Sequence, residues 1–247
     1  MNDFHAIILA AGKGSRMGVD IPKVLIPLCG KPMISHILDA LSALGIGTPV
    51  IVVGKQHQVF EETLDDEAIY AEQEEQLGSG HAVMCARDAS PATGHTLVMC
   101  GDSPLFRLET IRALMNTHRT DDSAVTLVSA ILDDPFGYGR ILRNTVGEIT
   151  GVVEEKSASS EQKAVREING GCYAFKAQWL WDNIDLLTRN EAGEFNLTQM
   201  VDIAIRQGLR VTSVTANPDE VAGVNTPDQL RQAEEILMAR GDCRMKA

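Results

Sequence analysis

Short apolar runs alternate with segments of helical periodicity through the first half of the chain, and this alternation permits few folds. Five runs have the length and apolar content of buried strands: residues 6–11, 49–53, 68–72, 95–100 and 124–132. Between them, apolar side chains recur at helical spacing over residues 32–44, 56–64, 80–89 and 108–118. Strands and helices that alternate at this interval form βαβ units. We therefore expect an α/β protein with a mostly parallel central sheet.

The pattern changes after residue 135. Residues 139–142 and 149–155 are typical of strands, and the stretch 144–147 between them is typical of a hairpin turn. Residues 157–161 predict a polar loop. The rest predicts a strand at 168–175, helices at 177–187 and 197–207, a strand at 209–214 and an amphipathic helix at 228–239. No repeat, low-complexity linker or break in composition divides the chain, so we expect one domain with a hairpin insertion over the sheet.

The first predicted strand ends in a glycine-rich basic loop, Gly12-Lys13-Gly14-Ser15-Arg16. Glycine permits positive φ and close approach of a ligand to the backbone, and successive N–H groups in such a loop attract anions. Residues 9–31 contain four basic side chains and one acidic side chain, a local balance of +3, whereas the whole chain carries −12. A basic loop on an acidic protein favours a polyphosphate ligand.

The loop is also compatible with a plain strand–turn–helix corner that carries solvated lysines, and two familiar phosphate motifs do not fit it. The dinucleotide fingerprint G-x-G-x-x-G requires glycine at position 17, which is methionine, and Gly18 comes one position late. Gly54 and Lys55 follow the second strand, where that fingerprint requires an acid. The P-loop pattern is absent.

Composition excludes several classes of protein. A sequence pI near 4.9 argues against nonspecific nucleic-acid binding. The five cysteines are scattered and contain no C-x-x-C pair, so we expect neither a disulfide framework nor a zinc site, but reduced thiols. Residues 1–5 lack the positive start that is typical of a signal peptide, and no apolar run approaches the roughly 20 residues of a membrane span. We expect a cytoplasmic protein without a membrane partner.

Asp102 follows the predicted strand 95–100 almost directly. Ligands of open parallel sheets bind at the carboxyl ends of the strands, where the Gly12 loop also lies. A carboxylate beside a phosphate-binding loop would repel the ligand, and a bridging Mg²⁺ resolves that conflict. The plain alternative is that Asp102 caps the turn before Ser103 and Pro104.

Other polar positions are ambiguous when each is taken alone. Residues 73–81 offer amide and backbone groups for the edge of a base, but Ser79 is equally typical of a helix cap. Gly139, Glu154 and Asn169 are each compatible with a turn or a solvated strand end. Asn225 is likewise compatible with a simple cap of the terminal helix.

The combination and order of these segments carry more information. The motifs L-A-A-G-K-G-S-R-M, P-K-V-L, E-Q-L-G-S-G-H-A-V, G-D-S-P-L, G-Y-G-R-I, V-V-E-E-K, E-I-N-G-G and G-V-N resemble the sugar nucleotidyltransferase family over residues 6–230. Within it they most resemble the uridylyltransferases that act on N-acetylglucosamine 1-phosphate. The resemblance implies a Rossmann-like three-layer nucleotidyltransferase fold over 1–247. Its nucleotide half would span about 1–135, its sugar-binding half about 136–230, and its C-terminal helix about 228–240.

The resemblance also implies a reaction and a set of site residues. The substrates would be UTP and a sugar 1-phosphate, and the products UDP-N-acetylglucosamine and pyrophosphate. Arg16 and Lys23 would hold the phosphates as the catalytic cations, and Mg²⁺ would bind Asp102 and Asn225. Nucleotide contacts are assigned to Leu9, Ala10, Ala11, Gly12, Lys23, Gln73, Gly78 and Ser79, and sugar contacts to Gly139, Glu154 and Asn169.

Several departures from the family pattern bear on the sugar. Ser157 follows Lys156 where the family usually has aspartate, Gly170 stands where threonine is usual, and Gln199 stands where an acid is usual. The chain stops at Ala247 without hexapeptide repeats, so we expect no acetyltransferase activity and no trimer of the associated kind, although a weak homo-oligomer stays open. The alternatives are another hexose 1-phosphate, another nucleotide, or a non-catalytic nucleotide-binding regulator.

Overall fold

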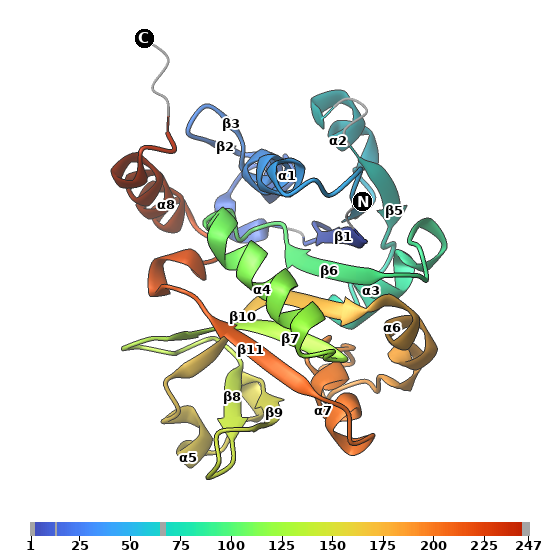
Figure 1. Cartoon of the computed structure of the whole chain (residues 1–247). Helices are drawn as coiled ribbons and strands as arrows, with labels where there is room; N and C mark the ends of the chain where they lie inside the picture. Colours follow the sequence, from blue (N-terminus) through green and yellow to red (C-terminus); the bar gives the residue numbers. More distant parts are fainter. Residues whose placement is uncertain (1–2, 13, 65–67, 244–247) are drawn as a thin grey trace.

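A mixed seven-strand path forms the centre of the molecule in the computed structural model, which describes residues 3–12, 14–64 and 68–243 (Figure 1). The strand order is β11-β7-β10-β6-β1-β4-β5. The bounds are β1 Phe4–Leu9, β4 Val50–Val53, β5 Ile69–Glu72, β6 His95–Cys100, β7 Val125–Ile131, β10 Glu167–Lys176 and β11 Val211–Thr215. All neighbours pair in parallel except β10, which is antiparallel to β6 and β7. The predicted strands and the mostly parallel sheet are confirmed.

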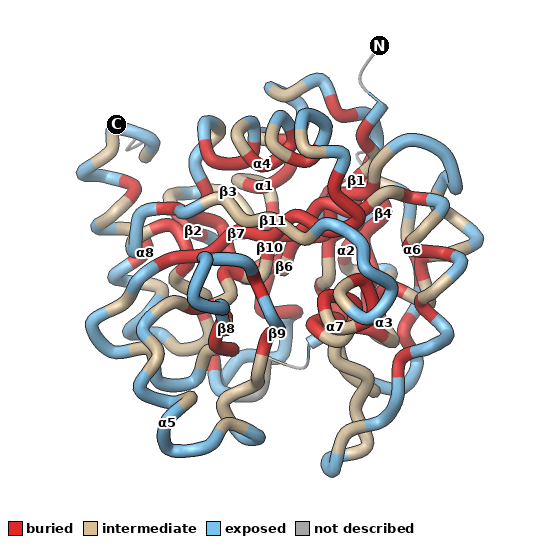
Figure 2. The backbone as a smooth tube through the Cα atoms, turned by 60° about the horizontal axis from the view of Figure 1, so that its bottom comes forward, coloured by how far each residue is buried: buried red, intermediate tan, exposed pale blue. Residues whose placement is uncertain are grey.

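Helices cover both faces of this sheet. Side chains alternate along β1, so Ile8 joins a core with α1 (Met33–Ala43), α2 (His57–Leu64) and α4 (Leu108–Thr120), while Ile7 faces the opposite way. The second core packs α3 (Ser79–Cys85), α6 (Ala177–Asn183) and α7 (Gln199–Arg206) against the other face. In Figure 2 the buried residues follow the strands between these helices. The three-layer α/β fold is therefore confirmed.

The predicted hairpin insertion is present as β8 (Arg140–Arg143) and β9 (Ile149–Val153), at the bottom of Figure 1. Its base is fixed by Arg140, a residue only 1% exposed whose guanidinium pairs with Glu155 at 2.7 Å. The prediction of a polar loop at 157–161 is wrong in part. A 3-10 turn at Glu155–Ser157 and the short helix α5 (Ser160–Lys163) occupy this stretch, because Ser159 and Gln162 form a capping box.

A register shift interrupts β10 between Asn169 and Tyr173. Gly170 lies in this irregularity and is closely packed, since a Cβ there would lie 2.9 Å from a methyl carbon of Val221 and 3.0 Å from the Val128 carbonyl oxygen. A threonine at position 170 does not fit this packing. The departure from the family pattern thus has a local packing cause.

The C-terminal helix α8 (Pro227–Arg240) packs against the small β2–β3 hairpin (Pro27–Leu28 and Lys31–Pro32), beside it in Figure 1. Thr226 caps α8, and an apolar cluster fills the contact: Leu28, Met33, Leu105, Val224, Ala233 and Leu237. Cys29 and Cys243 form a disulfide here, with Cα atoms 5.3 Å apart. The expectation of uniformly reduced thiols is therefore wrong, since folding joins two cysteines 214 positions apart. Within the described residues, no helix is long and apolar enough to cross a bilayer.

Candidate active site

The carboxyl ends of β1 and β6 and the start of α3 enclose a cavity of about 270 Å³. All eight residues predicted to contact the nucleotide line it, together with Asp102: Leu9, Ala10, Ala11, Gly12, Lys23, Gln73, Gly78 and Ser79. These residues come from four separate segments of the sequence. The fold therefore gathers at one edge of the sheet the groups that the motifs singled out.

The glycine-rich loop passes directly over Lys23. Gly14 and Gly18 have φ of 59° and 70°, on either side of a 3-10 turn at Ser15–Met17. A Cβ at Gly14 would lie 2.7 Å from the Cβ of Lys23, so only glycine allows the loop to approach this closely. Lys13, one of the two basic residues of this loop, lies outside the described residues.

Four polar side chains from distant segments meet beside this loop. The Lys23 ammonium donates to Oδ2 of Asp102 at 2.5 Å and to Oδ1 of Asn225 at 2.7 Å. The same amide oxygen accepts a bond from the Arg16 guanidinium at 3.0 Å. The backbone N–H of Val224 donates to the Asp102 carbonyl at 2.8 Å, which fixes the two segments to one another. The predicted convergence of Arg16, Lys23, Asp102 and Asn225 is therefore present.

The donor set of this cluster fits a hard divalent cation. One carboxylate and one amide oxygen face the same ammonium nitrogen, so a single cation at that point touches both. Mg²⁺ prefers oxygen ligands and usually keeps several waters, taking one or two protein ligands plus substrate phosphates. Elsewhere in the described residues, no group of three or more His, Cys, Asp or Glu side chains is arranged to hold a metal ion.

Gln73 also lines the cavity, and hydrogen bonds fix the orientation of its amide. It is only 3% exposed, and its Nε2 donates to the Gly78 carbonyl at 3.1 Å and lies 3.0 Å from Nδ1 of His81. Because a carbonyl accepts only, the amide nitrogen must face Gly78, and Oε1 is left to accept from a ligand. The side chain of Gln73 therefore presents a hydrogen-bond acceptor to the cavity.

The loop after Gln73 is held by the segment before α7. Gly78 has φ of 98°, and a Cβ there would lie 2.6 Å from the Phe195 carbonyl oxygen. Phe195 donates its N–H to Leu77 at 2.7 Å, and the Ser79 hydroxyl accepts from the N–H of Leu197 at 3.0 Å. Ser79 therefore does not act as a helix cap. Its hydroxyl instead joins the nucleotide loop to the sugar half of the chain.

The three residues predicted to bind the sugar also lie together. From the position that a Cβ of Gly139 would occupy, Oε2 of Glu154 is 3.5 Å away and the Cβ of Asn169 is 3.7 Å away. The N–H of Asn169 donates to the Gly139 carbonyl at 2.9 Å. Cys100 connects this group to the nucleotide cavity, because it lines that cavity and its sulfur lies 3.4 Å from where a Cβ of Gly171 would stand. Burial raises the pKa of Cys100 to about 12, so it stays a thiol.

Two residues that sequence reasoning missed hold the sugar-side groups in place. The Thr198 hydroxyl donates to Oε1 of Glu154 at 2.7 Å. The Asn169 amide donates to the Tyr173 hydroxyl at 2.5 Å, and its Oδ1 accepts from the N–H of Gly171 at 3.3 Å. Burial raises the pKa of Tyr173 well above its usual range, so it stays protonated. Neither residue stands out in the sequence, since Thr198 looks like a helix cap and Tyr173 like a core strand residue.

Gln199, which stands where the family usually has an acid, forms hydrogen bonds with the loop that precedes α7. Oε1 of Gln199 accepts from the N–H and the hydroxyl of Thr188 at 3.0 and 3.1 Å, and Nε2 donates to the Thr188 carbonyl at 2.8 Å. An acid could not donate that third bond. Gln199 therefore fastens the loop before α7.

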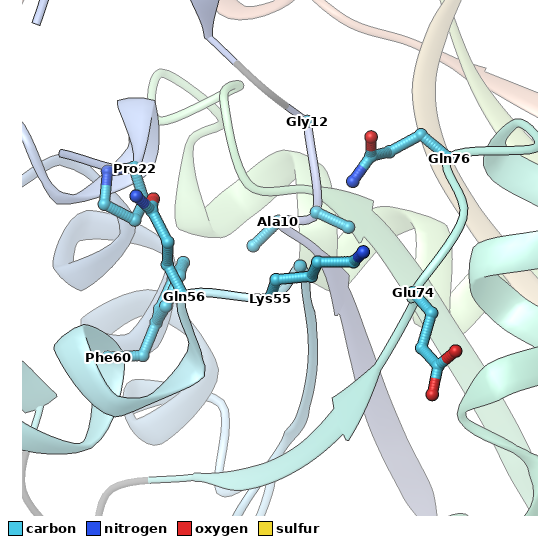
Figure 3. Close-up of a pocket in the computed structure, with 10 residues that line it drawn as sticks. Ala10, Gly12, Pro22, Lys55, Gln56, Phe60, Glu74 and Gln76 are labelled. Carbon is cyan, nitrogen blue, oxygen red and sulfur yellow. The ribbon is translucent and has the colours of Figure 1, made fainter. Parts of the chain in front are cut away.

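A second cavity of about 390 Å³ is also lined by Ala10, Ala11 and Gly12 (Figure 3). Figure 3 shows the Lys55 side chain extending between this backbone and Glu74, with Gln76 above it. Gln76 and residues 10–12 line both cavities. The nucleotide cavity therefore has a polar neighbour that the sequence did not predict.

Comparison with known proteins gives consistent matches. A family model described as the MobA-like NTP transferase domain matches residues 6–165. Two proteins named bifunctional protein GlmU, from Heliobacterium modesticaldum and Clostridium novyi, are 44% and 42% identical over 97% and 95% of this chain. Those matches cover 53% and 52% of the two proteins, so the chain spans about half the length of these curated relatives. The solved inositol-1-phosphate CTP transferase from T. maritima has a TM-score of 0.76 at 19% identity, covering 96% of this chain and 95% of that one, which supports the fold.

Proposed function

The chain belongs to the family of MobA-like NTP transferase domains and is a nucleotidyltransferase, and on that premise we propose that it transfers a uridylyl group from UTP to N-acetylglucosamine 1-phosphate. The products are UDP-N-acetylglucosamine and pyrophosphate. The observation that carries the proposal is the meeting of Lys23 with Asp102 and Asn225 beside a cavity lined by every predicted nucleotide contact. The identity to proteins named GlmU supports the choice of amino sugar.

Uracil is the base that the Gln73 side chain favours. Its Oε1 is an acceptor and its Nε2 is engaged by Gly78 and His81. Uracil carries an N–H at ring position 3, whereas cytosine carries a lone pair there. A fixed acceptor therefore binds uracil and leaves cytosine with two opposed acceptors, which is costly in a buried site.

The residues at the phosphates supply charge and position. Lys23 and Arg16 meet at the Asn225 side chain, where they would supply positive charge to phosphate oxygens, and the N–H groups of the Gly12 loop would add partial positive charge. Asp102 and Asn225 would hold Mg²⁺, which when bound would neutralise charge that develops during in-line displacement at the α-phosphorus. Phosphoryl-transfer chemistry of this kind depends on positioning and electrostatics more than on a protein base.

The sugar side presents oriented polar groups. Glu154 retains Oε2 as an acceptor near Gly139 while Oε1 is bound to Thr198. Asn169 keeps one amide hydrogen for a ligand after bonding Tyr173. Sites of this kind select hydroxyl and amide patterns, because a missing partner leaves a polar group unpaired. Gln199 and Gly170, which depart from the family pattern, have local roles in the contacts to Thr188 and in the packing against Val221.

Pyrophosphate release from UTP tests the proposal against a panel of acceptors: N-acetylglucosamine 1-phosphate, glucose 1-phosphate, mannose 1-phosphate and inositol 1-phosphate. We expect the highest kcat/KM with N-acetylglucosamine 1-phosphate and a strict requirement for Mg²⁺. Turnover of another acceptor without use of the amino sugar would replace the proposed sugar. Absence of pyrophosphate release from every acceptor, with UTP and with the other nucleoside triphosphates, would overturn nucleotidyl transfer itself.

A further inference from the structure

In this structure, the positive charge beside the two proposed metal ligands is the side chain of a lysine, Lys23. The Lys23 ammonium contacts both Asp102 and Asn225, at 2.5 and 2.7 Å, and its side chain is 9% exposed. An ammonium and a divalent ion do not share one position, because like charges repel strongly at contact distance. The same lysine is also the group proposed to bind phosphate. The Lys23 ammonium can therefore occupy the position between the two metal ligands or bind the phosphates, but it cannot do both at once.

We propose that Lys23 is an internal counter-ion that blocks the metal site until a nucleotide triphosphate draws it away. Without nucleotide, Lys23 neutralises Asp102 and leaves no room for a divalent cation. When the triphosphate enters the cavity, the ammonium turns to the phosphate oxygens, and Asp102 and Asn225 become available. The metal then binds with the nucleotide rather than before it. The inference rests on the proposed function, which assigns the metal to these two residues.

The surrounding structure permits this exchange. Lys23 lies in the 3-10 turn Lys23–Leu25, and its Cβ is held against Gly14, so its backbone is fixed while the four-carbon stem can rotate at its end. Arg16 shares the Asn225 oxygen at 3.0 Å and can follow the same phosphates. The nucleotide cavity is lined by both Lys23 and Asp102, so the ammonium has only to swing within one site.

The exchange predicts that removing Lys23 improves metal binding in the absence of nucleotide, although it abolishes turnover. We would measure Mn²⁺ affinity by the loss of the free Mn²⁺ paramagnetic resonance signal, with the whole chain and no nucleotide. The variants are K23M, the double variant K23M/D102N, and K55M. K55M is the matched control. It removes the same charge from the same edge of the sheet, and Lys55 lines the neighbouring cavity (Figure 3).

We expect K23M to bind Mn²⁺ at least about tenfold more tightly than the unmodified chain, since a unit charge at contact distance has been removed. K55M should bind like the unmodified chain, and K23M/D102N should lose the gain. If K23M binds Mn²⁺ no more tightly than the unmodified chain, while K23M/D102N binds it more weakly than K23M, the exchange is overturned and the metal assignment stands. Equal binding by K23M and K23M/D102N would overturn the metal assignment in the proposed function. Circular dichroism checks folding, and K23Q replaces K23M if that variant unfolds.

Discussion

The hydroxyl of Thr198 donates a 2.7 Å hydrogen bond to Oε1 of Glu154, across 44 positions of sequence. This bond fixes one oxygen of the carboxylate and leaves the other beside Gly139. A residue at the start of α7 thereby orients a group on the hairpin insertion. The proposed sugar side is therefore held by contacts between elements, beyond the three residues that the motifs assign to it.

Substitution T198V should weaken sugar binding selectively. A hydrogen bond to a charged group contributes about 1.5 kcal/mol or more, so we expect the KM for the sugar 1-phosphate to rise roughly tenfold. The KM for UTP and kcat should change less than about twofold. T198S retains the hydroxyl and should restore the KM, and T150V, at an exposed position of β9, is the matched control. A parallel rise in both KM values would contradict a positioning role.

Substitution Q73L should reduce the preference for UTP over CTP. The leucine removes the buried acceptor proposed to receive the uracil N–H, and the Gly78 carbonyl keeps its bond from the Ala82 N–H at 3.1 Å. We expect kcat/KM for UTP to fall at least about tenfold, with a smaller loss for CTP, because one buried hydrogen bond decides between the bases. Steady-state kinetics with both nucleotides measures the ratio. An unchanged ratio would remove Gln73 from base recognition.

Stability should decline as pH falls from 6.5, because the buried His118 and the half-buried His36 and His95 resist protonation in the folded chain. Burial lowers the pKa of His118 to about 3, and it lowers those of His36 and His95 as well. A histidine of ordinary pKa in the unfolded chain takes up a proton below 6.5, while His118 does not until about pH 3. Proton binding therefore favours the unfolded state between these values.

The His118 contribution alone amounts to about 2 kcal/mol of unfolding free energy between pH 7 and pH 5. Urea unfolding at several pH values measures it. H118Q should flatten this dependence. A slope in H118Q as steep as in the unmodified chain would assign the pH dependence to other groups.

The disulfide should stabilise the attachment of α8. Cross-linking Cys29 to Cys243 closes nearly the whole chain, and loop-closure entropy gives an upper limit of about 5 kcal/mol. The double variant C29S/C243S should unfold at lower urea concentration, and dithiothreitol should shift the unmodified chain to the same midpoint. If the reduced and oxidised chains unfold at one midpoint, this bond contributes nothing to stability.

Local patterns predicted the elements well, because apolar periodicity in helices and strands is set by burial against one sheet. They also predicted which loops meet, because the carboxyl ends of parallel strands share one edge, as Gly12 and Asp102 do. The pairing of Cys29 with Cys243 escaped them, since only the packing of α8 on the β2–β3 hairpin brings these residues together. The contacts of Thr198 with Glu154 and of Tyr173 with Asn169 were not predicted for the same reason. Their partners are distant in sequence, and each side chain has an ordinary local explanation.

The D102N variant tests most directly whether the cluster of Lys23, Asp102 and Asn225 is the catalytic centre. The substitution keeps shape and removes the charge that faces Lys23 at 2.5 Å. The measurement is the rate of pyrophosphate release from UTP and N-acetylglucosamine 1-phosphate over a range of Mg²⁺ concentrations. We predict a loss in kcat of at least about 100-fold that excess Mg²⁺ does not restore, as expected when electrostatic stabilisation of a developing charge is removed. A rate and a Mg²⁺ dependence equal to those of the unmodified chain would contradict the assignment.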